Sequence, residues 1–430
     1  MYRALRGMND ALPHRAGGSS ELRRFLEETS SKIFRRFGYN EIRTPILEEK
    51  DLFVKSIGDQ TDIVTKEMFS FCDRGERDVA MRPEGTAPIV RAYLEASLHK
   101  TMPFQKFYYI EPMFRAERPQ AGRLRQFNQI GAEAIGSLSP AIDAEAILLL
   151  TKILDECKIN GYTIRLNNLG CHADKIRLSK NLKENLSDKK SLLCDDCKKR
   201  LSTNPLRVLD CKKENCRFTV RGVMKSIDFL CDDCKSHFSK VKELLGTVLS
   251  EKKCIDDPYI VRGLDYYTRT VFEISHPALG AQDAIGAGGR YDNLIKDMGG
   301  PALGAVGFAL GVERMIMTYA KDCVNIGEKT SEFVKPVSIY IATIGEKAQY
   351  KAFKIMDELR NSNIGCDMDY EEKSLKAQMR AADKLGAKFV YIIGDEELEK
   401  GSAILRNMKN TEQHTVKFEE IKEKLKTYNL

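Results

Sequence analysis

Residues 103–136 limit the possible folds of this chain more than any other stretch. They read as two strands joined by a loop that contains Arg118, Arg123 and Arg125. Strands joined in this way form an antiparallel hairpin, and a basic hairpin loop suits a polyphosphate. Side chains alternate between the two faces of a strand. One face of the second strand therefore carries Phe127, Gln129, Gly131 and Glu133.

The polar residues of that face have two interpretations, because polar residues on strands usually face water. Other segments favour a binding site. Residues 82–86 bring Glu84, Gly85 and Thr86 together, as suits an ammonium group, although a turn with a helix cap would look the same. Residues 261–268 place Arg262 beside a glycine and two tyrosines.

Two glycine-rich segments follow. Residues 286–292 let the backbone approach a ligand closely, although such runs alone are weak evidence. Residues 304–314 predict a strand that runs into a helix, with Arg314 in the first helical turn. An isolated arginine at that place would more often be a surface residue.

The chain has 430 residues, which exceeds what one hydrophobic core usually serves. Residues 1–170 read as mixed α and β, beginning with an amphipathic helix from about 20 to 37. Residues 259–319 return to a β-rich, glycine-rich pattern, so the cysteine-rich segment 171–250 interrupts one domain. From Pro336 onward, strands alternate with helices near 347–362 and 374–385, which indicates an α/β unit.

Composition excludes some classes of protein. No apolar stretch approaches the roughly 18 residues of a membrane span, and the N-terminus lacks the apolar region of a secretion signal. We therefore expect a cytoplasmic protein. The net charge of +7 is too small to indicate nucleic-acid binding by itself, but residues 171–250 hold 18 Lys and Arg against 11 Asp and Glu.

The same segment holds seven of the twelve cysteines. In a cytosolic chain this density indicates metal binding rather than disulfides. Two CxxC pairs can supply the four thiolates of a structural zinc site. Cys211 and Cys216 lie between the pairs, and buried free cysteines are an equal alternative, so the ligand set stays open. The expected zinc ligands are Cys194, Cys197, Cys231 and Cys234.

Together these motifs resemble those of the class II aminoacyl-tRNA synthetases, and within them the histidyl-tRNA synthetase family. Residues 39–45, 114–127 and 304–314 resemble the three class motifs, and RGLDYYT and AGGRYDNL resemble the two motifs peculiar to the histidine enzymes. The resemblance implies an α+β catalytic domain built on an antiparallel sheet, a small inserted domain and a C-terminal α/β anticodon-binding domain. The expected domains are 1–170 with 251–325, 171–250, and 331–430.

The resemblance also implies roles for residues. The α-ammonium group of L-histidine would bind at Glu84, Gly85, Thr86 and Gln129. The imidazole ring would meet Glu133 and Tyr267, and Tyr266 and Tyr291 would close the pocket. Arg115 and Arg262 would be catalytic, at the α-phosphate of ATP and the histidine carboxylate, while Arg123 and Arg314 would bind the other phosphates. Arg118 and Gln120 would lie near the tRNA acceptor end.

The implied reaction is activation of histidine with ATP and Mg²⁺, followed by transfer to tRNA(His), in a homodimer whose interface contains residues 39–45. Three alternatives remain. A non-charging paralogue, such as the regulatory subunit of ATP phosphoribosyltransferase, typically lacks the C-terminal domain that is present here. A prolyl or threonyl enzyme does not explain RGLDYYT and GGRYDNL, and a basic RNA-binding protein does not explain the pocket residues.

Overall fold

The computed structural model describes residues 2–13, 20–222, 225–249, 253–322 and 337–428. The chain divides into two compact units, Met1–Ile326 and Gly327–Leu430. The expected boundary between residues 325 and 331 lies outside the described residues, and so does residue 251, where the catalytic domain was expected to resume. The expected domain limits stay predictions.

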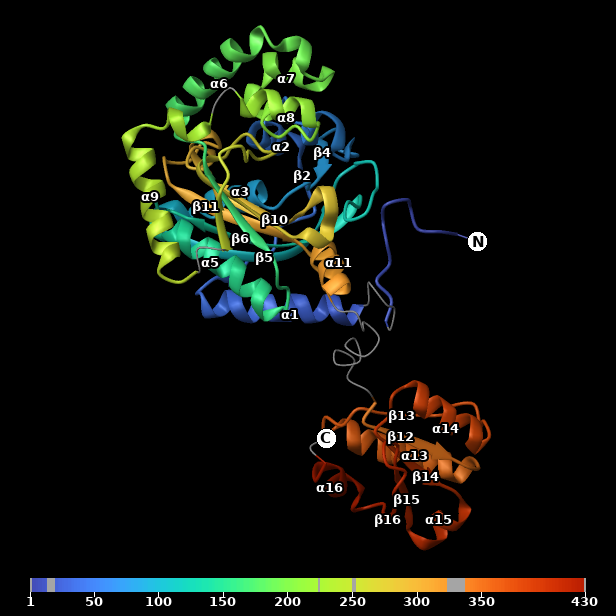
Figure 1. Ribbon diagram of the computed structural model, residues 1–430. Helices are drawn as coiled ribbons and strands as arrows, with labels where there is room; N and C mark the ends of the chain where they lie inside the picture. The colour runs from blue at the N-terminus through green and yellow to red at the C-terminus, as the bar shows by residue number, and fades with distance from the viewer. Residues whose placement is uncertain (1, 14–19, 223–224, 250–252, 323–336, 429–430) are drawn as a thin grey trace. The chain divides into compact units, whose positions relative to one another are not determined.

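An eight-stranded sheet forms the centre of the N-terminal unit, in the order β1-β5-β6-β11-β10-β9-β7-β8 (Figure 1). All neighbouring pairs are antiparallel except β1 with β5 and β7 with β8. The predicted antiparallel sheet is therefore confirmed. The strands are β1 Asn40–Glu41, β5 Gln105–Phe114, β6 Gln126–Ile135, β7 Thr163–Asn168, β8 Cys254–Asp256, β9 Thr268–Ser275, β10 Ala284–Arg290 and β11 Ala305–Gly311.

The hairpin predicted from residues 103–136 is the pair β5–β6, which is in register over its whole length. The expected strand-to-helix segment 304–314 is also present as β11 followed by a helix. The segment 39–45 contributes only the two-residue strand β1, and residues 42–45 lie outside any described strand. The segment ends at Pro45, which has no N–H group to donate to a neighbouring strand.

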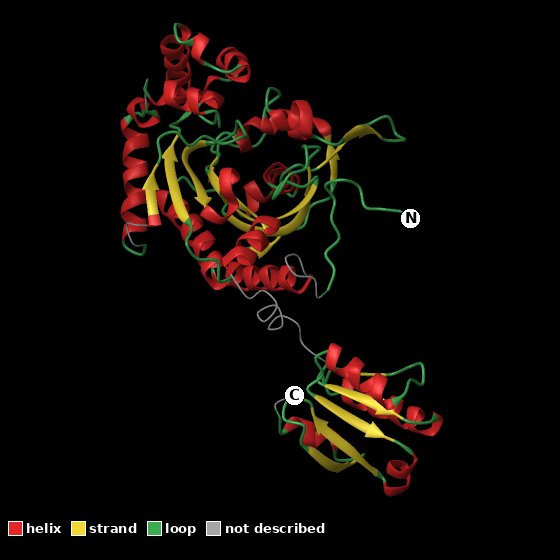
Figure 2. Cartoon of the chain, turned by 45° about the vertical axis from the view of Figure 1, so that its right-hand side comes forward, coloured by secondary structure: helices red, strands yellow, loops and turns green. Residues whose placement is uncertain are grey.

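Helices cover the sheet (Figures 1 and 2). The first of them, α1 Ser20–Arg36, matches the predicted amphipathic helix and buries Leu22, Leu26, Ile33 and Phe34. Phe34 stacks on Tyr108 of β5, with 4.6 Å between ring centroids. The other helices of this unit are α2 Lys50–Ile57, α3 Thr86–Glu95, α4 Leu98–Thr101, α5 Pro140–Glu156, α6 His172–Ser187, α7 Asp195–Thr203, α8 Glu214–Arg221, α9 Asp232–Gly246, α10 Leu294–Asp297 and α11 Val312–Asp322.

A small antiparallel sheet follows β1 in the chain, with the strand order β2-β4-β3. Its strands are β2 Leu47–Glu49, β3 Ser70–Cys72 and β4 Asp78–Met81. The chain leaves β4 at the buried Arg82, whose guanidinium donates hydrogen bonds to the carbonyl oxygens of Thr44 and Pro112. These bonds fix the loop that leads from β4 into α3, and three of the four expected ammonium-binding residues, Glu84, Gly85 and Thr86, lie where this loop enters the helix.

The cysteine-rich segment 171–250 folds as the helices α6 to α9, and α6, α7 and α8 lie together at the top of the unit in Figure 1. Its described apolar side chains share a core with the catalytic domain. Leu178, Leu182 and Val208 belong to the same buried cluster as Tyr93 and Tyr109 of the catalytic domain. The insert is therefore packed firmly against the residues that surround the expected site.

The C-terminal unit has a five-stranded mixed sheet, in the order β13-β12-β14-β15-β16. The predicted alternation of strands and helices is confirmed, with β12 and β14 parallel neighbours in the sheet. The strands are β12 Ile339–Thr343, β13 Cys366–Met368, β14 Phe389–Ile393, β15 Ser402–Asn407 and β16 Gln413–Lys417. The helices are α13 Glu346–Arg360, α14 Leu375–Lys384, α15 Asp395–Lys400 and α16 Ile421–Lys426.

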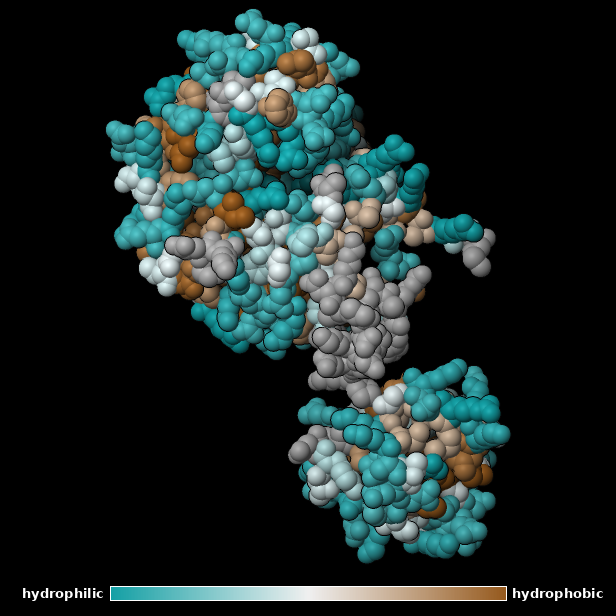
Figure 3. Space-filling view, in the orientation of Figure 1, coloured by the Kyte–Doolittle hydropathy of each residue, from teal (hydrophilic) through white to brown (hydrophobic). Residues whose placement is uncertain are grey.

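Among the described residues, no helix combines the length and the apolar composition that crossing a membrane requires. The surface of the N-terminal unit that Figure 3 shows is mostly hydrophilic, with scattered apolar residues.

Candidate active site

A cavity of about 590 Å³ lies in the N-terminal unit and brings most of the expected site residues together. Strands β6, β10 and β11 contribute to its lining, together with the loops before α3 and before β9. The expected residues that line it are Glu84, Thr86, Arg115, Arg123, Gln129, Arg262, Tyr266, Tyr267 and Arg314.

Glu133 and Tyr291 do not line the cavity but lie directly behind it. The hydroxyl of Thr86 donates to Oε1 of Glu133 over 2.7 Å, and the hydroxyl of Tyr291 donates to Oε2 over 2.6 Å. Glu133 is 1% exposed, and burial raises the pKa of its carboxyl group to about 8, although both hydroxyl groups oppose this shift. A protonated, neutral carboxyl group therefore lies behind the cavity at neutral pH when no ligand is bound.

Glu84 provides a second buried carboxyl group, and it caps helix α3. Its oxygens accept hydrogen bonds from the backbone N–H groups of Thr86 and Ala87, at 2.7 and 2.9 Å. Burial raises the pKa of Glu84 above its usual value, although these two hydrogen bonds partly oppose the rise. The helix cap considered as an alternative from the sequence is thus real. It does not exclude binding, because a carboxylate can accept about four hydrogen bonds.

Gln129 presents an unsatisfied acceptor. Its Oε1 atom is buried and has no hydrogen-bond partner among the described residues, and the side chain lines the cavity. A buried acceptor without a hydrogen-bond partner costs roughly 1–3 kcal/mol of free energy. A ligand N–H group that donates to Gln129 would remove this cost. Gln129 and Glu84 together offer acceptor oxygens to a cationic ligand.

Three tyrosines pack around these polar groups. The rings of Tyr266 and Tyr267 lie 4.7 Å apart, and Tyr266 meets Tyr291 edge to face at 5.7 Å. Burial raises the pKa of Tyr267 to about 12 and moves the pKa values of Tyr266 and Tyr291 well above their usual value. The three hydroxyl groups therefore stay protonated and can donate hydrogen bonds.

Glycines make room for this arrangement. A Cβ atom on Gly307 would lie 1.7 Å from Oε2 of Glu133, and one on Gly131 would lie 2.2 Å from the ring of Tyr109. Gly85 serves the same purpose, since its Cβ would lie 2.5 Å from that ring. Gly85 itself does not line the cavity. Sequence reasoning missed Tyr109, which lines the cavity opposite Gly131, and only the pairing of the two strands could have indicated it.

The arginines form a second group in the cavity. Arg115 donates from Nε to the carbonyl oxygen of Pro83, beside Glu84, and its guanidinium lies over the ring of Phe127. Arg123 pairs with Glu117 at 2.9 Å. Burial lowers the pKa of Arg314, and the positive charge of Arg123 adds to this effect. Such a concentration of positive charge favours a polyanion.

Arg262 lies next to the tyrosines. Its Nη1 atom donates to Oε2 of Glu273 over 2.7 Å, while its Nε atom is buried without a partner among the described residues. Glu273, which sequence reasoning missed, thus holds one end of the guanidinium and leaves other donors for a ligand. Arg118 and Gln120, in contrast, are exposed and do not line the cavity.

The insert also reaches the cavity, which the sequence did not indicate. Its lining includes Arg200, Arg207, Lys212 and Lys213 of the segment 171–250. The expected zinc set is not brought together. Cys194 and Cys197 cluster with Cys211 and Cys216, whereas Cys231 and Cys234 cluster with Cys171 and Asp174. The expectation of one site made from both CxxC pairs was wrong, because the two pairs begin different helices, α7 and α9.

Comparison with known proteins agrees with this geometry. Residues 7–194 and 220–315 match the family model of histidyl-tRNA synthetase. The chain belongs to the histidyl-tRNA synthetase family. Residues 338–428 match the model of an anticodon-binding domain, so the expected C-terminal domain is confirmed.

Relatives match over nearly the whole chain. A histidine–tRNA ligase of Thermosipho melanesiensis is 45% identical, and the match covers 96% of each chain. One of Thermodesulfovibrio yellowstonii is 46% identical over 98% of this chain and 97% of its own. Among solved structures, the apo histidyl-tRNA synthetase of S. aureus has a TM-score of 0.80 at 32% identity, and the match covers 99% of this chain and 100% of that one.

The raised pKa of Glu133 predicts a pH effect on stability. A carboxyl group whose pKa is raised by folding contributes stability that is complete below its unfolded pKa of about 4.5 and is lost as the pH rises through about 8. The loss is at most on the order of 5 kcal/mol. Glu133→Gln resembles the protonated acid and cannot ionise, so its thermal unfolding should depend less on pH between pH 5 and 9. Identical pH profiles for both proteins would contradict the assignment.

Proposed function

We propose that this cavity activates L-histidine with ATP and then passes the histidine to tRNA(His). The chain is a histidine–tRNA ligase, as its full-length relatives and its anticodon-binding domain indicate. A non-charging paralogue is disfavoured by the same two findings. One observation supports the proposed roles of the residues most directly: a single cavity joins the buried carboxyl group of Glu84 and the unsatisfied oxygen of Gln129 with a group of arginines.

The acidic and amide side chains of the cavity would bind the amino acid. The α-ammonium group would meet Glu84 and Gln129, and the imidazole ring would lie against Tyr267, with Glu133 behind it. The buried polar groups around Glu133 would set the selectivity for histidine. A ligand that lacks the ring nitrogen atoms would leave these groups without hydrogen-bond partners, so the pocket would reject it. Thr86 and Tyr291 hold the carboxyl group in place through its two oxygens.

The arginines would bind ATP. Arg314 and Arg123 would hold the outer phosphates. Arg115 and Arg262 would hold the α-phosphate, because Arg115 donates to Pro83, next to Glu84, and Arg262 interacts with Tyr267. Glu117 and Glu273 also line the cavity and offer the oxygen ligands that Mg²⁺ prefers. A bound Mg²⁺ ion would neutralise phosphate charge. The zinc expected in the insert takes no part in these steps.

Two steps follow from this placement. In the first, a carboxylate oxygen of histidine attacks the α-phosphorus atom, the bond to the β-phosphate oxygen breaks, and pyrophosphate leaves. In the second, a hydroxyl of the terminal ribose of tRNA attacks the carbonyl carbon of the adenylate, and AMP leaves. The arginines stabilise the charge that builds on the α-phosphate, so catalysis rests on alignment and electrostatics. No covalent intermediate with the protein is required.

The tRNA would contact both units. The exposed Arg118 and Gln120 of the β5–β6 loop would approach the acceptor end. In the anticodon-binding domain, Lys376 and Arg380 are exposed and four residues apart on α14. Lys373 precedes the helix and pairs with Glu371. Charging assays with altered anticodons would test this contact. Because charging serves translation, we place the protein in the cytoplasm, which cell fractionation can check.

Exchange of pyrophosphate into ATP tests the proposed activity. With each of the twenty amino acids offered separately, only histidine should support exchange. A protein that exchanges with no amino acid would be a non-charging paralogue, and exchange with proline or threonine would indicate a sister enzyme. Either outcome would contradict the proposal.

Arg262 should be essential for the chemical step. Arg262→Ala should lower the rate of adenylate formation on the order of 10²–10³-fold, about 3–4 kcal/mol, with less effect on histidine affinity. Arg262→Lys keeps the charge but loses the paired donors, so it should recover only part of the rate. Single-turnover kinetics measure this, with the exposed Arg36→Ala as the control. A rate near that of the unaltered protein for Arg262→Ala would remove the residue from the active site.

We further propose that the chain forms a homodimer through residues 39–45 and their neighbours. Strand β1 lies at one edge of the large sheet, and Ile46 and Leu47 are 41% and 46% exposed shortly after it. Leu47→Lys should weaken the dimer in sedimentation experiments, whereas Leu192→Lys, at an exposed leucine of the insert, should not. A stable, active monomer at micromolar concentration would contradict the proposal.

A further inference from the structure

Four cysteines of the insert bring their sulfur atoms to one point. The Sγ atoms of Cys194, Cys197, Cys211 and Cys216 all lie within 4.8 Å of one another. Those of Cys194 and Cys211 are 3.9 Å apart, far beyond the roughly 2.05 Å of a disulfide, and all four cysteines are free. Three of them are buried and Cys194 is partly exposed.

We propose that these four cysteines bind one structural Zn²⁺ ion, which holds residues 194–217 in place as a wall of the catalytic cavity. Zinc bound tetrahedrally at about 2.3 Å from each sulfur would place the sulfurs about 3.8 Å apart. The observed sulfur positions need little change to reach this geometry. The spacing C-x2-C-x13-C-x4-C is also shorter than the spacing between the two CxxC pairs, and it is closer to that of known zinc sites.

The local backbone favours thiolates at this point. Cys194 is the N-cap residue of α7 and Cys197 lies in its first turn, while Cys216 lies in the first turn of α8. The positive end of a helix stabilises a thiolate. The backbone N–H group of Cys194 also donates to Sγ of Cys216 over 3.2 Å. Hydrogen bonds of this kind stabilise a sulfur atom that carries negative charge.

The charge of the surrounding residues also suits a zinc site with four thiolates. Four thiolates and one Zn²⁺ ion carry a net charge of about −2. Residues 194–217 contain seven Lys and Arg against four Asp and Glu, so the segment compensates for this charge.

The proposed site lies at the cavity. Cys194 and Cys211 themselves belong to its lining, together with Lys212 and Lys213. Between the second and third cysteine, the chain is tied to two acidic residues of the catalytic domain, Asp265 and Asp62, and Arg200 also pairs with Asp62. Asn204 donates to Asp265 over 2.8 Å, and Arg207 lies 3.4 Å from Asp62. Zinc at the cysteines would add a third fixed point and set the position of the basic residues that face the cavity.

The family model leaves this segment unmatched. The match ends at residue 194 and resumes at residue 220, so three of the four cysteines lie in the gap. The proposed site is therefore a feature of this chain beyond the pattern that identifies the family. It does not depend on which amino acid the cavity activates.

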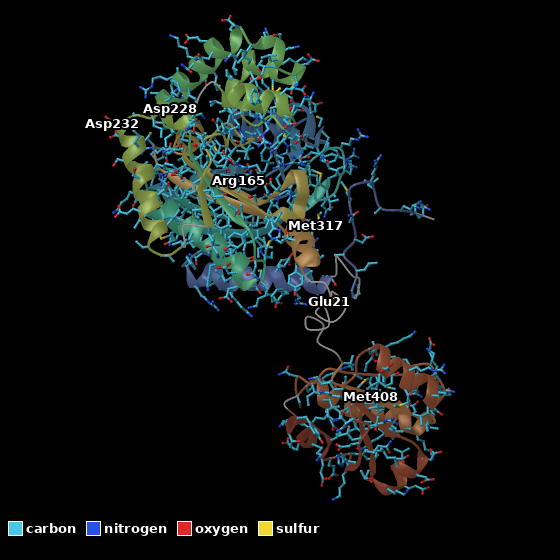
Figure 4. All side chains as sticks on the ribbon, viewed as in Figure 1. Glu21, Arg165, Asp228, Asp232, Met317 and Met408 are labelled. Carbon is cyan, nitrogen blue, oxygen red and sulfur yellow. The ribbon has the colours of Figure 1, made fainter. Side chains whose placement is uncertain are left out.

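The second cysteine cluster has an explanation without metal. The Oδ2 atom of Asp174 accepts hydrogen bonds from the backbone N–H groups of Cys171 and Cys231, and Oδ1 pairs with Arg177. Its carboxylate thus caps the starts of α6 and α9. Figure 4 labels Asp232, which begins α9 directly after Cys231. This cluster provides matched control positions.

Elemental analysis tests the proposal on full-length protein purified without chelator. We expect about one zinc ion per chain, lost in Cys211→Ser and Cys216→Ser and kept in Cys171→Ser and Cys231→Ser. Less than about a tenth of an equivalent in the unaltered protein would overturn the proposal. Loss of zinc from Cys231→Ser but not from Cys211→Ser would overturn the ligand set.

Two further measurements avoid variants that fail to fold. Replacing zinc with Co²⁺ in the unaltered protein should give the intense absorption of a tetrahedral site with thiolate charge transfer, and its absence would count against four cysteine ligands. Removing the metal should increase hydrogen exchange in residues 194–217 and leave the C-terminal unit unchanged. Unchanged exchange in 194–217 would overturn the role of the metal in fixing the cavity wall.

Discussion

The ion pair between Arg290 and Asp143 holds the N-terminal unit together at its centre. Both side chains are fully buried, and Nε of Arg290 lies 2.8 Å from Oδ1 of Asp143. The pair joins β10 to α5, and Oδ2 of Asp143 also meets His237 of α9 at 2.8 Å. Arg290 donates further to the carbonyl oxygen of Ser137. Removing one partner of such a pair leaves a buried charge, at a cost of about 3–5 kcal/mol. The sheet, its helical layer and the insert therefore depend on the same contact.

This contact also fixes the pocket. Tyr291 follows Arg290 in the chain, and its hydroxyl group is one of the two that hold Glu133. Arg290 binds Asp292 on the other side, whose carboxylate accepts from the backbone of Ala305 at the start of β11. Glu133 in turn faces Gly307 of that strand. The position of the groups proposed to bind the imidazole ring is thus set by buried structure behind the cavity.

The sequence predicted the elements with strong periodicity and many of the residues that line the cavity, but it missed Tyr109, Glu273 and the basic residues of the insert. The hairpin β5–β6, helix α1 and the α/β pattern of the C-terminal unit follow from local spacing. Contacts between distant segments did not follow from it. Cys194 lies near Cys211 rather than Cys231 because the chain after α7 returns and packs residues 205–208 against that helix. Tyr109 reaches the cavity only through pairing opposite Gly131. The sequence shows the residues that come into contact, but it does not show how the strands pair or how the chain runs between the cysteines.

The two charge groups of the cavity determine how a substrate can lie in it. An amino acid carries a positive ammonium group and a negative carboxylate a few bonds apart. In the proposed binding mode, Glu84 and Gln129 would attract the first, and Arg115 and Arg262 would attract the second. The reverse orientation would place the carboxylate beside buried acceptors and leave them unpaired, which is costly. In this proposed binding mode the carboxylate would point toward the arginines that would hold the α-phosphate, and the orientation would bring the reacting atoms together.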